Sequence, residues 1–223
     1  MVIGNWFAYH PLPITHNPRH MKIICIGRNY VDHISELNNE KPTEPVIFLK
    51  PDTAILPKQT PFVIPAFSND VHHEVEILVK IAKVGKYIDA KFAHKYYEEI
   101  GLGIDFTARD VQTNLKEKGL PWEKAKAFDH SAIIGDFLPK KELPSLENIN
   151  FELRNNKQIV QEGNSSLMLW KIDELIAYVS QYFTLKKGDI IFTGTPKGVA
   201  KVQENDVLEG FLEGKQVFKI QVK

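Results

Sequence analysis

The clearest pattern of apolar and polar positions lies in residues 71–81, VHHEVEILVKI. Successive side chains of a β-strand point to opposite faces, so the odd positions from 75 to 81 form a uniformly apolar face that we expect in the core. The opposite face carries Glu74 and Glu76, whose Cβ atoms would lie roughly 6–7 Å apart. This stretch therefore predicts a strand with one core face and one acidic face.

Shorter apolar runs at residues 22–27 and 46–50 predict two further strands. The segment NINFELRNNKQIV predicts a hairpin that turns at Asn155–Asn156. From residue 188 to the end, the pattern indicates short strands and turns.

Helical signals are fewer. Residues 31–37, VDHISEL, suit one or two helical turns, and an apolar stripe from about residue 172 to 182 predicts a longer helix. Between them, residues 106–119 predict a helix that Thr107 can cap and that Gly119 ends. Many short strands, few helices and no repeated strand–helix unit indicate a β-rich α+β domain and not a doubly wound sheet.

The first residues of the chain show no such period. Residues 1–20 hold three prolines and three histidines, and they end in His20–Met21 directly before the first predicted strand. They are either a native N-terminal extension or a segment derived from cloning, and both interpretations remain open.

Composition narrows the class of protein. Basic and acidic residues balance at 28 each, which argues against a general nucleic-acid binder. The single cysteine, Cys25, excludes a disulfide framework within the chain and fits a small core residue. No apolar stretch approaches the ~20 residues of a membrane helix, and no signal peptide is apparent. We therefore expect a cytoplasmic protein that associates with neither nucleic acid nor membrane.

Two glutamates on one strand face need an explanation. Like charges this close raise each other's pKa unless solvent or a cation relieves them. An exposed strand face would supply solvent, whereas a hard divalent ion would relieve them by coordination. Asp105, at a strand-to-helix junction, is either an N-cap or a third carboxylate of such a site. Arg109 and Gln112 follow it at i, i+3 on one helix face, which is typical of a site for an anionic ligand.

Six segments, in order, resemble the fumarylacetoacetate hydrolase family: GRNYVDHISEL, EPVIFLKP, HHEVEI, GIDFTARDVQ, LPWEKAKAFDHSAIIGDF and GDIIFTGTPKGV. The resemblance covers residues 22–223 and is closest to the short, single-domain acylpyruvase and oxaloacetate decarboxylase type. It implies a mixed β-sandwich roll, a catalytic domain over residues 21–223 and a homodimer.

The resemblance also implies a metal site. Glu74, Glu76 and Asp105 match the family's metal-binding carboxylates, with Mg²⁺ or Mn²⁺ as the cofactor. His72 shares the carboxylate face and His73 points to the core side. Neither histidine is expected as a ligand, because three carboxylates suffice for a hard ion that keeps some of its water molecules.

Catalytic and substrate-binding residues follow from the same resemblance. Lys126, in preference to Lys124, matches a lysine near the metal and the substrate. His33 and Glu36, at i, i+3, match a pair on a short, mobile helix over the site, in which the carboxylate orients the imidazole. The residues implied to contact the substrate are Arg28, Tyr30, Arg109, Gln112 and Thr195.

The implied activity is divalent-metal-dependent cleavage of the C3–C4 bond of a 2-oxo acid through a metal-stabilised pyruvate enolate. Oxaloacetate would lose carbon dioxide, whereas an acylpyruvate would need a water molecule that His33 activates as a general base. Alternatives are a 2-hydroxyhepta-2,4-diene-1,7-dioate isomerase or a 5-carboxymethyl-2-oxo-hex-3-ene-1,6-dioate decarboxylase of aromatic catabolism, or an oxaloacetate tautomerase. A binding protein that keeps the fold without catalysis is a further alternative.

Overall fold

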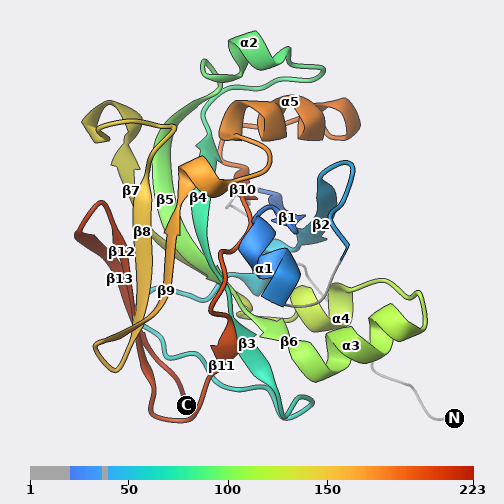
Figure 1. Cartoon of the computed structure of the whole chain (residues 1–223), viewed down its shortest axis with the longest axis vertical. Coiled ribbons are helices and arrows are strands. Elements are labelled where there is room, and N and C mark those ends of the chain that lie inside the picture. Colours follow the sequence, from blue (N-terminus) through green and yellow to red (C-terminus); the bar gives the residue numbers. More distant parts are fainter. Residues whose placement is uncertain (1–20, 37–39) are drawn as a thin grey trace, which may run out of the picture.

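The computed structural model describes residues 21–36 and 40–223, which form three β-sheets with helices at their edges and ends (Figure 1). The largest sheet has six strands in the order β2-β1-β10-β4-β5-β7. Strands β1 and β10 pair in parallel and the other neighbours pair antiparallel, so the sheet is mixed. Its strands are β1 (Ile23–Gly27), β2 (Val46–Lys50), β4 (Val75–Ile81), β5 (Tyr97–Asp105), β7 (Ala132–Pro139) and β10 (Ile190–Phe192).

The two smaller sheets flank the start of β4. A four-stranded antiparallel sheet runs in the order β13-β12-β8-β9, and a three-stranded one in the order β11-β3-β6. The larger of these consists of β8 (Asn150–Asn155), β9 (Gln158–Asn164), β12 (Val207–Leu212) and β13 (Lys215–Gln221). The smaller consists of β3 (Val71–His73), β6 (Thr107–Ala108) and β11 (Ala200–Lys201).

The helices are short and lie outside the sheets (Figure 1). In Figure 1, α5 and α2 lie together at the top, α1 lies in front of the six-stranded sheet, and α3 and α4 lie below it. The α-helices are α1 (Val31–Glu36), α2 (Ala90–Ala93), α3 (Arg109–Glu117), α4 (Glu123–Lys126) and α5 (Ile172–Tyr182). Three single 3₁₀ turns are η1 (Asp52–Ala54), η2 (Lys140–Glu142) and η3 (Ser165–Leu167).

The core has two parts, one on each face of β4. The larger part combines Val75 and Ile77 of β4 with Phe151 of β8 and Leu208 of β12, so it fills the space between the six-stranded and four-stranded sheets. The smaller part, on the opposite face of β4, includes Leu78, Cys25 and Phe192. The predicted β-rich α+β fold is confirmed, as is the place of Cys25 in the core.

The segment 71–81 is not one continuous strand. It breaks at Glu74 into β3 and β4, which belong to different sheets. The acidic face is also buried. Glu74 and Glu76 expose 4% and 2% of their surface, and Leu78 exposes none. Solvent therefore does not relieve the two glutamates, and the exposed-face alternative is wrong.

The helix predicted over residues 106–119 begins at Arg109, and Thr107 does not cap it. Thr107 lies fully buried in β6 opposite His72, where its hydroxyl lies 3.4 Å from the Asp105 carbonyl oxygen. The pairing of β6 with β3 thus overrides the capping preference of threonine. Gly119 ends the helix as expected, with φ at 62°.

The predicted hairpin forms, but its turn lies one residue later. Asn155 pairs with Gln158, and the two turn residues are Asn156 and Lys157. Both have positive φ, 51° and 71°, as a two-residue turn matched to the strand twist requires. The strands expected near 22–27 and 46–50 and the helix from 172 to 182 are confirmed.

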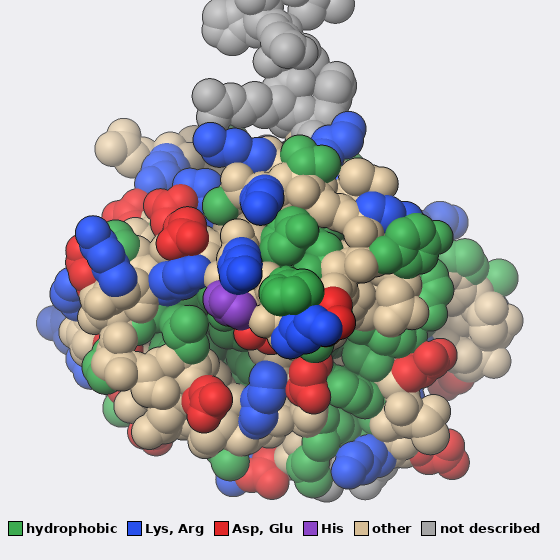
Figure 2. Space-filling view, turned by 90° about the horizontal axis from the view of Figure 1, so that it is seen from above, with side chains coloured by type: hydrophobic (Ala, Val, Ile, Leu, Met, Phe, Trp, Pro, Cys, Tyr) green, Lys and Arg blue, Asp and Glu red, His purple; other side chains and the backbone are tan. Residues whose placement is uncertain are grey.

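Among the described helices, none is long and apolar enough to cross a membrane. Figure 2 shows basic and acidic side chains mixed across one face, without separation by sign. That face therefore lacks the one-signed field of a nucleic-acid-binding surface.

Candidate active site

The site lies where β10 leaves β4. The ladder between them ends at Phe192 and Leu78, and the chain then turns away through Thr193 and Gly194. The Thr193 backbone N–H donates to the Ile77 carbonyl oxygen at 3.1 Å. The Gly194 N–H instead donates to a carboxylate oxygen of Glu76 at 2.7 Å. From Gly194 onward, a side chain of β4 and not its backbone therefore accepts the hydrogen bond.

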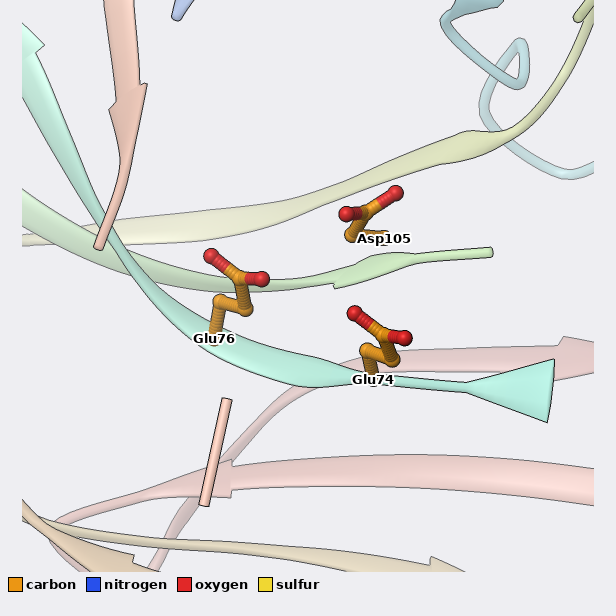
Figure 3. Close-up of side chains that lie close together, drawn as sticks. All are labelled: Glu74, Glu76 and Asp105. Carbon is orange, nitrogen blue, oxygen red and sulfur yellow. The ribbon is translucent and has the colours of Figure 1, made fainter. Parts of the chain in front are cut away.

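Three carboxylates meet at this opening (Figure 3). Glu74 sits in the break between β3 and β4, Glu76 lies on β4, and Asp105 ends the neighbouring β5. The Asp105 N–H donates to the Glu74 carbonyl oxygen at 2.9 Å, which fixes the register of the two residues. All three are buried, and one oxygen of each lies within 4.8 Å of the others. The N-cap alternative for Asp105 is therefore wrong.

Three cationic side chains surround the carboxylates. Lys126 Nζ, on α4, donates to Glu74 Oε2 and to Asp105 Oδ2, both at 2.7 Å. Arg109 Nη2 donates to Glu74 Oε1 at 2.5 Å. Lys50 Nζ lies 2.7 Å from Asp105 Oδ1 and also donates to Ser131 Oγ. The three cations pair with Glu74 and Asp105, and this pairing makes the burial of these two charges tolerable.

Glu74 pairs with two of the cations and Glu76 with none of them, so the pKa values of the two glutamates shift in opposite directions. Burial acts to raise the pKa of Glu74, but Lys126 and Arg109 outweigh it and hold that pKa below its usual range. Burial, followed by the charge of Asp105, raises the pKa of Glu76 well above its usual range. Burial acts to lower the pKa of Lys126, yet Asp105 and Glu74 raise it to about 12.

The donor set fits a hard divalent ion. Carboxylate oxygens are the ligands that Mg²⁺ and Mn²⁺ prefer, and three converge here. Glu76 is the carboxylate with the raised pKa, so the cluster has a buried acid that a further cation would favour in its charged form. Within the described residues this is the one such group of acidic or metal-ligating side chains.

Helix α1 brings the predicted His33–Glu36 pair to the site. His33 is buried, and its Nδ1 lies 3.0 Å from Glu36 Oε2. The other oxygen, Glu36 Oε1, accepts a hydrogen bond from the Gly198 N–H at 2.9 Å. A salt bridge of 3.2 Å between Asp32 and Lys197 joins the same two segments. Glu36 thus orients the imidazole and also ties α1 to the loop after β10.

One cavity of about 40 Å³ gathers most of the predicted residues. Its lining includes eight of the eleven: Arg28, His33, Glu74, Glu76, Arg109, Gln112, Lys126 and Thr195.

The other three predicted residues do not line the cavity. Asp105 is fully buried but touches the cavity-lining Lys126. Glu36 acts through His33. Tyr30 is buried with its ring against Phe151, and its hydroxyl has no hydrogen-bond partner among the described residues.

Besides Ile26 and Gly27 of the cavity lining, four residues of the site escaped the sequence analysis. Lys116 lines the cavity from the last turn of α3, at i+7 from Arg109, so extending the Arg109–Gln112 face would have found it. Lys50 ends an apolar strand in phase with Phe48, whose ring lies 5.1 Å from Lys126 Nζ. Trp122 also lines the cavity, and no pattern in the sequence indicated it.

The fourth is Gln161, a polar residue at a buried position of β9. It also accounts for His73, which is buried against the Gln161 side chain. His72 pairs with Asp70 at 3.0 Å. Neither histidine belongs to the carboxylate group, as expected.

The chain is similar to known proteins over nearly its whole length. Residues 22–222 match the profile described as fumarylacetoacetate (FAA) hydrolase C-terminal. A mitochondrial oxaloacetate tautomerase of Bos taurus is 43% identical, over 90% of this chain and 91% of that protein. An oxaloacetate tautomerase of Escherichia coli is 41% identical, over 86% and 89%. A mitochondrial oxaloacetate decarboxylase of Dictyostelium discoideum is 42% identical, over the same shares.

Solved structures agree in fold. A fumarylpyruvate hydrolase of Pseudomonas aeruginosa, in complex with Mn²⁺ and pyruvate, superposes with a TM-score of 0.85 at 31% identity, over 91% of this chain and 89% of that one. A fumarylacetoacetate hydrolase family protein of Yersinia pestis reaches a TM-score of 0.87 at 39% identity, over 91% and 93%. The predicted β-sandwich roll is confirmed by these likenesses.

Because the pKa values of the two glutamates shift in opposite directions, replacing each one by glutamine should have opposite effects on the stability of the metal-free protein. Folding favours protonated Glu76, so its contribution to the free energy of unfolding is present below the unfolded pKa of about 4.3 and is lost as pH rises through the folded value. Glu76→Gln should therefore raise the melting temperature at pH 7. Glu74→Gln leaves the partly buried Arg109 without its anion and removes one of the two carboxylates that pair with Lys126, so it should cost about 3–5 kcal/mol.

Thermal melts in chelator and in Mg²⁺ check this prediction. Mg²⁺ should raise the melting temperature of the wild type, because it binds only the folded state, and should not raise that of Glu76→Gln. Destabilisation of similar size in both metal-free variants would contradict the unequal sharing of the cations.

Proposed function

The chain belongs to the fumarylacetoacetate hydrolase family, and on that premise we propose that it is a divalent-metal-dependent enzyme that interconverts the enol and keto forms of oxaloacetate. Residues 21–223 form its catalytic domain. Relatives at 41–43% identity that are named for oxaloacetate support this substrate. The expected homodimer, the cytoplasmic location and the choice of Mg²⁺ stay predictions.

The observation that carries the proposal is the size and charge of the cavity. The cavity, of about 40 Å³, is small. Arg28, Arg109 and Lys116 line it in addition to Lys126. This combination suits a short dicarboxylate better than a long diene-dioate.

Three cationic side chains of the cavity lining, those of Arg28, Arg109 and Lys116, lie close enough for their charges to interact. Burial, and then the charges of Arg28 and Arg109, lower the pKa of Lys116. Arg28 adopts a left-handed backbone conformation, with φ at 59°, a strain that clusters at ligand sites. An anionic substrate would be attracted to these side chains.

A divalent ion held by Glu74, Glu76 and Asp105 would supply a Lewis acid for the C1 carboxylate and C2 oxygen of the substrate. Lys126, beside the carboxylates, stabilises negative charge that develops on the C2 oxygen. Arg109 and Gln112, joined by a hydrogen bond of 2.6 Å, form one wall that orients a carboxylate.

His33 moves the proton. A carboxylate accepts hydrogen bonds, so the contact with Glu36 places the ring proton on Nδ1 and makes Nε2 the basic nitrogen. When the enol becomes the keto form, the hydroxyl group on C2 loses its proton and the electrons of the O–H bond form the C2=O π bond. The electrons of the C2=C3 π bond then bind a proton at C3. His33 accepts and returns this proton, so the step balances without a further reactant.

Cleavage of the C3–C4 bond is the second candidate. The decarboxylase of Dictyostelium discoideum and the fumarylpyruvate hydrolase of Pseudomonas aeruginosa support it. The same Lys126 would stabilise the charge left on the C2 oxygen when that bond breaks, since both reactions develop it there. A binding protein without catalysis is disfavoured, because His33, Lys126 and the glutamates line one cavity.

A substrate panel tests the proposed function. With Mg²⁺ present, the protein should accelerate the loss of enol absorbance of oxaloacetate more than it accelerates pyruvate formation from oxaloacetate or from acetylpyruvate. Chelator should remove the acceleration, and added Mg²⁺ should restore it. Undiminished turnover in chelator would exclude the metal, and pyruvate as the main product would favour the second candidate.

Lys116 tests the preference for a dianion. Lys116→Met removes one cation from the cavity and should raise KM for oxaloacetate roughly tenfold, with a smaller rise for the monoanion acetylpyruvate. Lys118→Met is the matched control, because Lys118 is exposed at the end of the same helix and does not line the cavity. Equal rises in KM for the two substrates would contradict this role.

His33 tests the proton transfer. His33→Asn should lower kcat for tautomerisation and for acylpyruvate hydrolysis about 10²-fold or more, and kcat for decarboxylation less, since loss of carbon dioxide needs no activated water. The three rates are compared at saturating Mg²⁺. Losses of the same size in all three reactions would refute this division of labour.

A further inference from the structure

Gln161 is a buried amide that belongs to one sheet and binds the elements of another. It lies on β9, the edge strand of the four-stranded sheet, and exposes 1% of its surface. Its side chain contacts His73 and Val75 on either side of Glu74, and also Thr195 and Pro196 in the loop after β10. It therefore links the break that holds a carboxylate of the cluster to the loop that lines the cavity.

All four hydrogen-bonding positions of this amide are used. Oε1 accepts from the Val75 N–H at 3.0 Å and from His73 Nδ1 at 2.8 Å. Nε2 donates to Thr195 Oγ1 at 2.9 Å and to the Pro196 carbonyl oxygen at 3.1 Å. A backbone N–H can only donate and a carbonyl oxygen can only accept, so Val75 and Pro196 together fix which end of the amide is oxygen.

This orientation determines the polarity of Thr195. Its Oγ1 accepts from Gln161, so its own proton has to be donated elsewhere. Among the described residues it reaches the Pro196 carbonyl oxygen, at 3.4 Å, which already receives the shorter bond from Gln161. Thr195 also lines the cavity.

We propose that Gln161 is a positioning residue that makes the Thr195 hydroxyl a hydrogen-bond donor to an oxygen of the bound 2-oxo acid. The inference rests on the proposed function only in taking a 2-oxo acid as the ligand. It does not depend on which reaction follows.

The same amide sets the tautomer of His73. Because Oε1 only accepts, the His73 ring carries its proton on Nδ1. Nitrogen NMR of the ring therefore reports the orientation of Gln161 without any ligand.

The experiment measures the affinity for pyruvate of Mn²⁺-loaded protein by calorimetry, in a double-mutant cycle. Gln161→Glu keeps the size of the side chain and the contacts to Val75 and His73, but its carboxylate accepts the Thr195 proton. It should weaken pyruvate binding roughly tenfold, or about 1.4 kcal/mol, and should have less than about a twofold effect in a Thr195→Val background. Gln158→Glu, exposed on the same strand, is the control for added charge.

Equal losses in both backgrounds would overturn the proposal, since Gln161 would then act independently of Thr195. So would unchanged affinity in Gln161→Glu, or a wild type that does not bind pyruvate. If Gln161→Glu does not fold, Thr195→Val should lose about tenfold while Thr195→Ser binds as the wild type does, and an unchanged Thr195→Val would overturn the donor role. Coupled pyruvate binding without turnover of oxaloacetate would count against the proposed function alone.

Discussion

Three carboxylates buried within 4.8 Å of one another are the constraint on which this structure depends. An isolated buried charge is prohibitively unfavourable, so each acid has to be paired or the fold has to open to water. Lys126, Lys50 and Arg109 come from three different elements and pair with Glu74 and Asp105, whereas burial favours the protonated form of Glu76. The cluster therefore joins β2, α3 and α4 to the centre of the six-stranded sheet, and its integrity and that of the fold are inseparable.

The departure of β10 from β4 gives this cluster an outlet. Up to the Thr193 N–H the two segments bond to each other through their backbones, and beyond it side chains accept instead: Glu76 accepts from Gly194, and Gln161 accepts from Val75. A backbone ladder is thus replaced by side-chain contacts along one short edge. The cavity beside this edge is lined by two glutamates and by four cationic side chains, those of Arg28, Arg109, Lys116 and Lys126.

Local patterns revealed several of the strands because period-two alternation survives in β4 and because β1 and β2 are short apolar runs. They failed where a tertiary pairing decides the outcome: Thr107 pairs with His72 in a ladder and therefore cannot cap α3. The acidic triad was reachable by combining spacing with the family resemblance, whereas spacing alone favoured a solvated face. Lys50 and Gln161 were missed because each acts on a partner far away in the sequence, 55 and 34 residues distant, and no local period encodes such contacts.

The account rests on the claim that the acidic triad holds one divalent ion that a 2-oxo acid then shares. Titration of Mn²⁺ into chelator-treated protein, with and without pyruvate and followed by electron paramagnetic resonance, tests it most directly. The account predicts one Mn²⁺ per chain, tighter binding when pyruvate is present, and loss of both in Asp105→Asn, because linked ligands strengthen each other reciprocally. Mn²⁺ binding that survives Asp105→Asn unchanged, or that pyruvate does not affect, would contradict it.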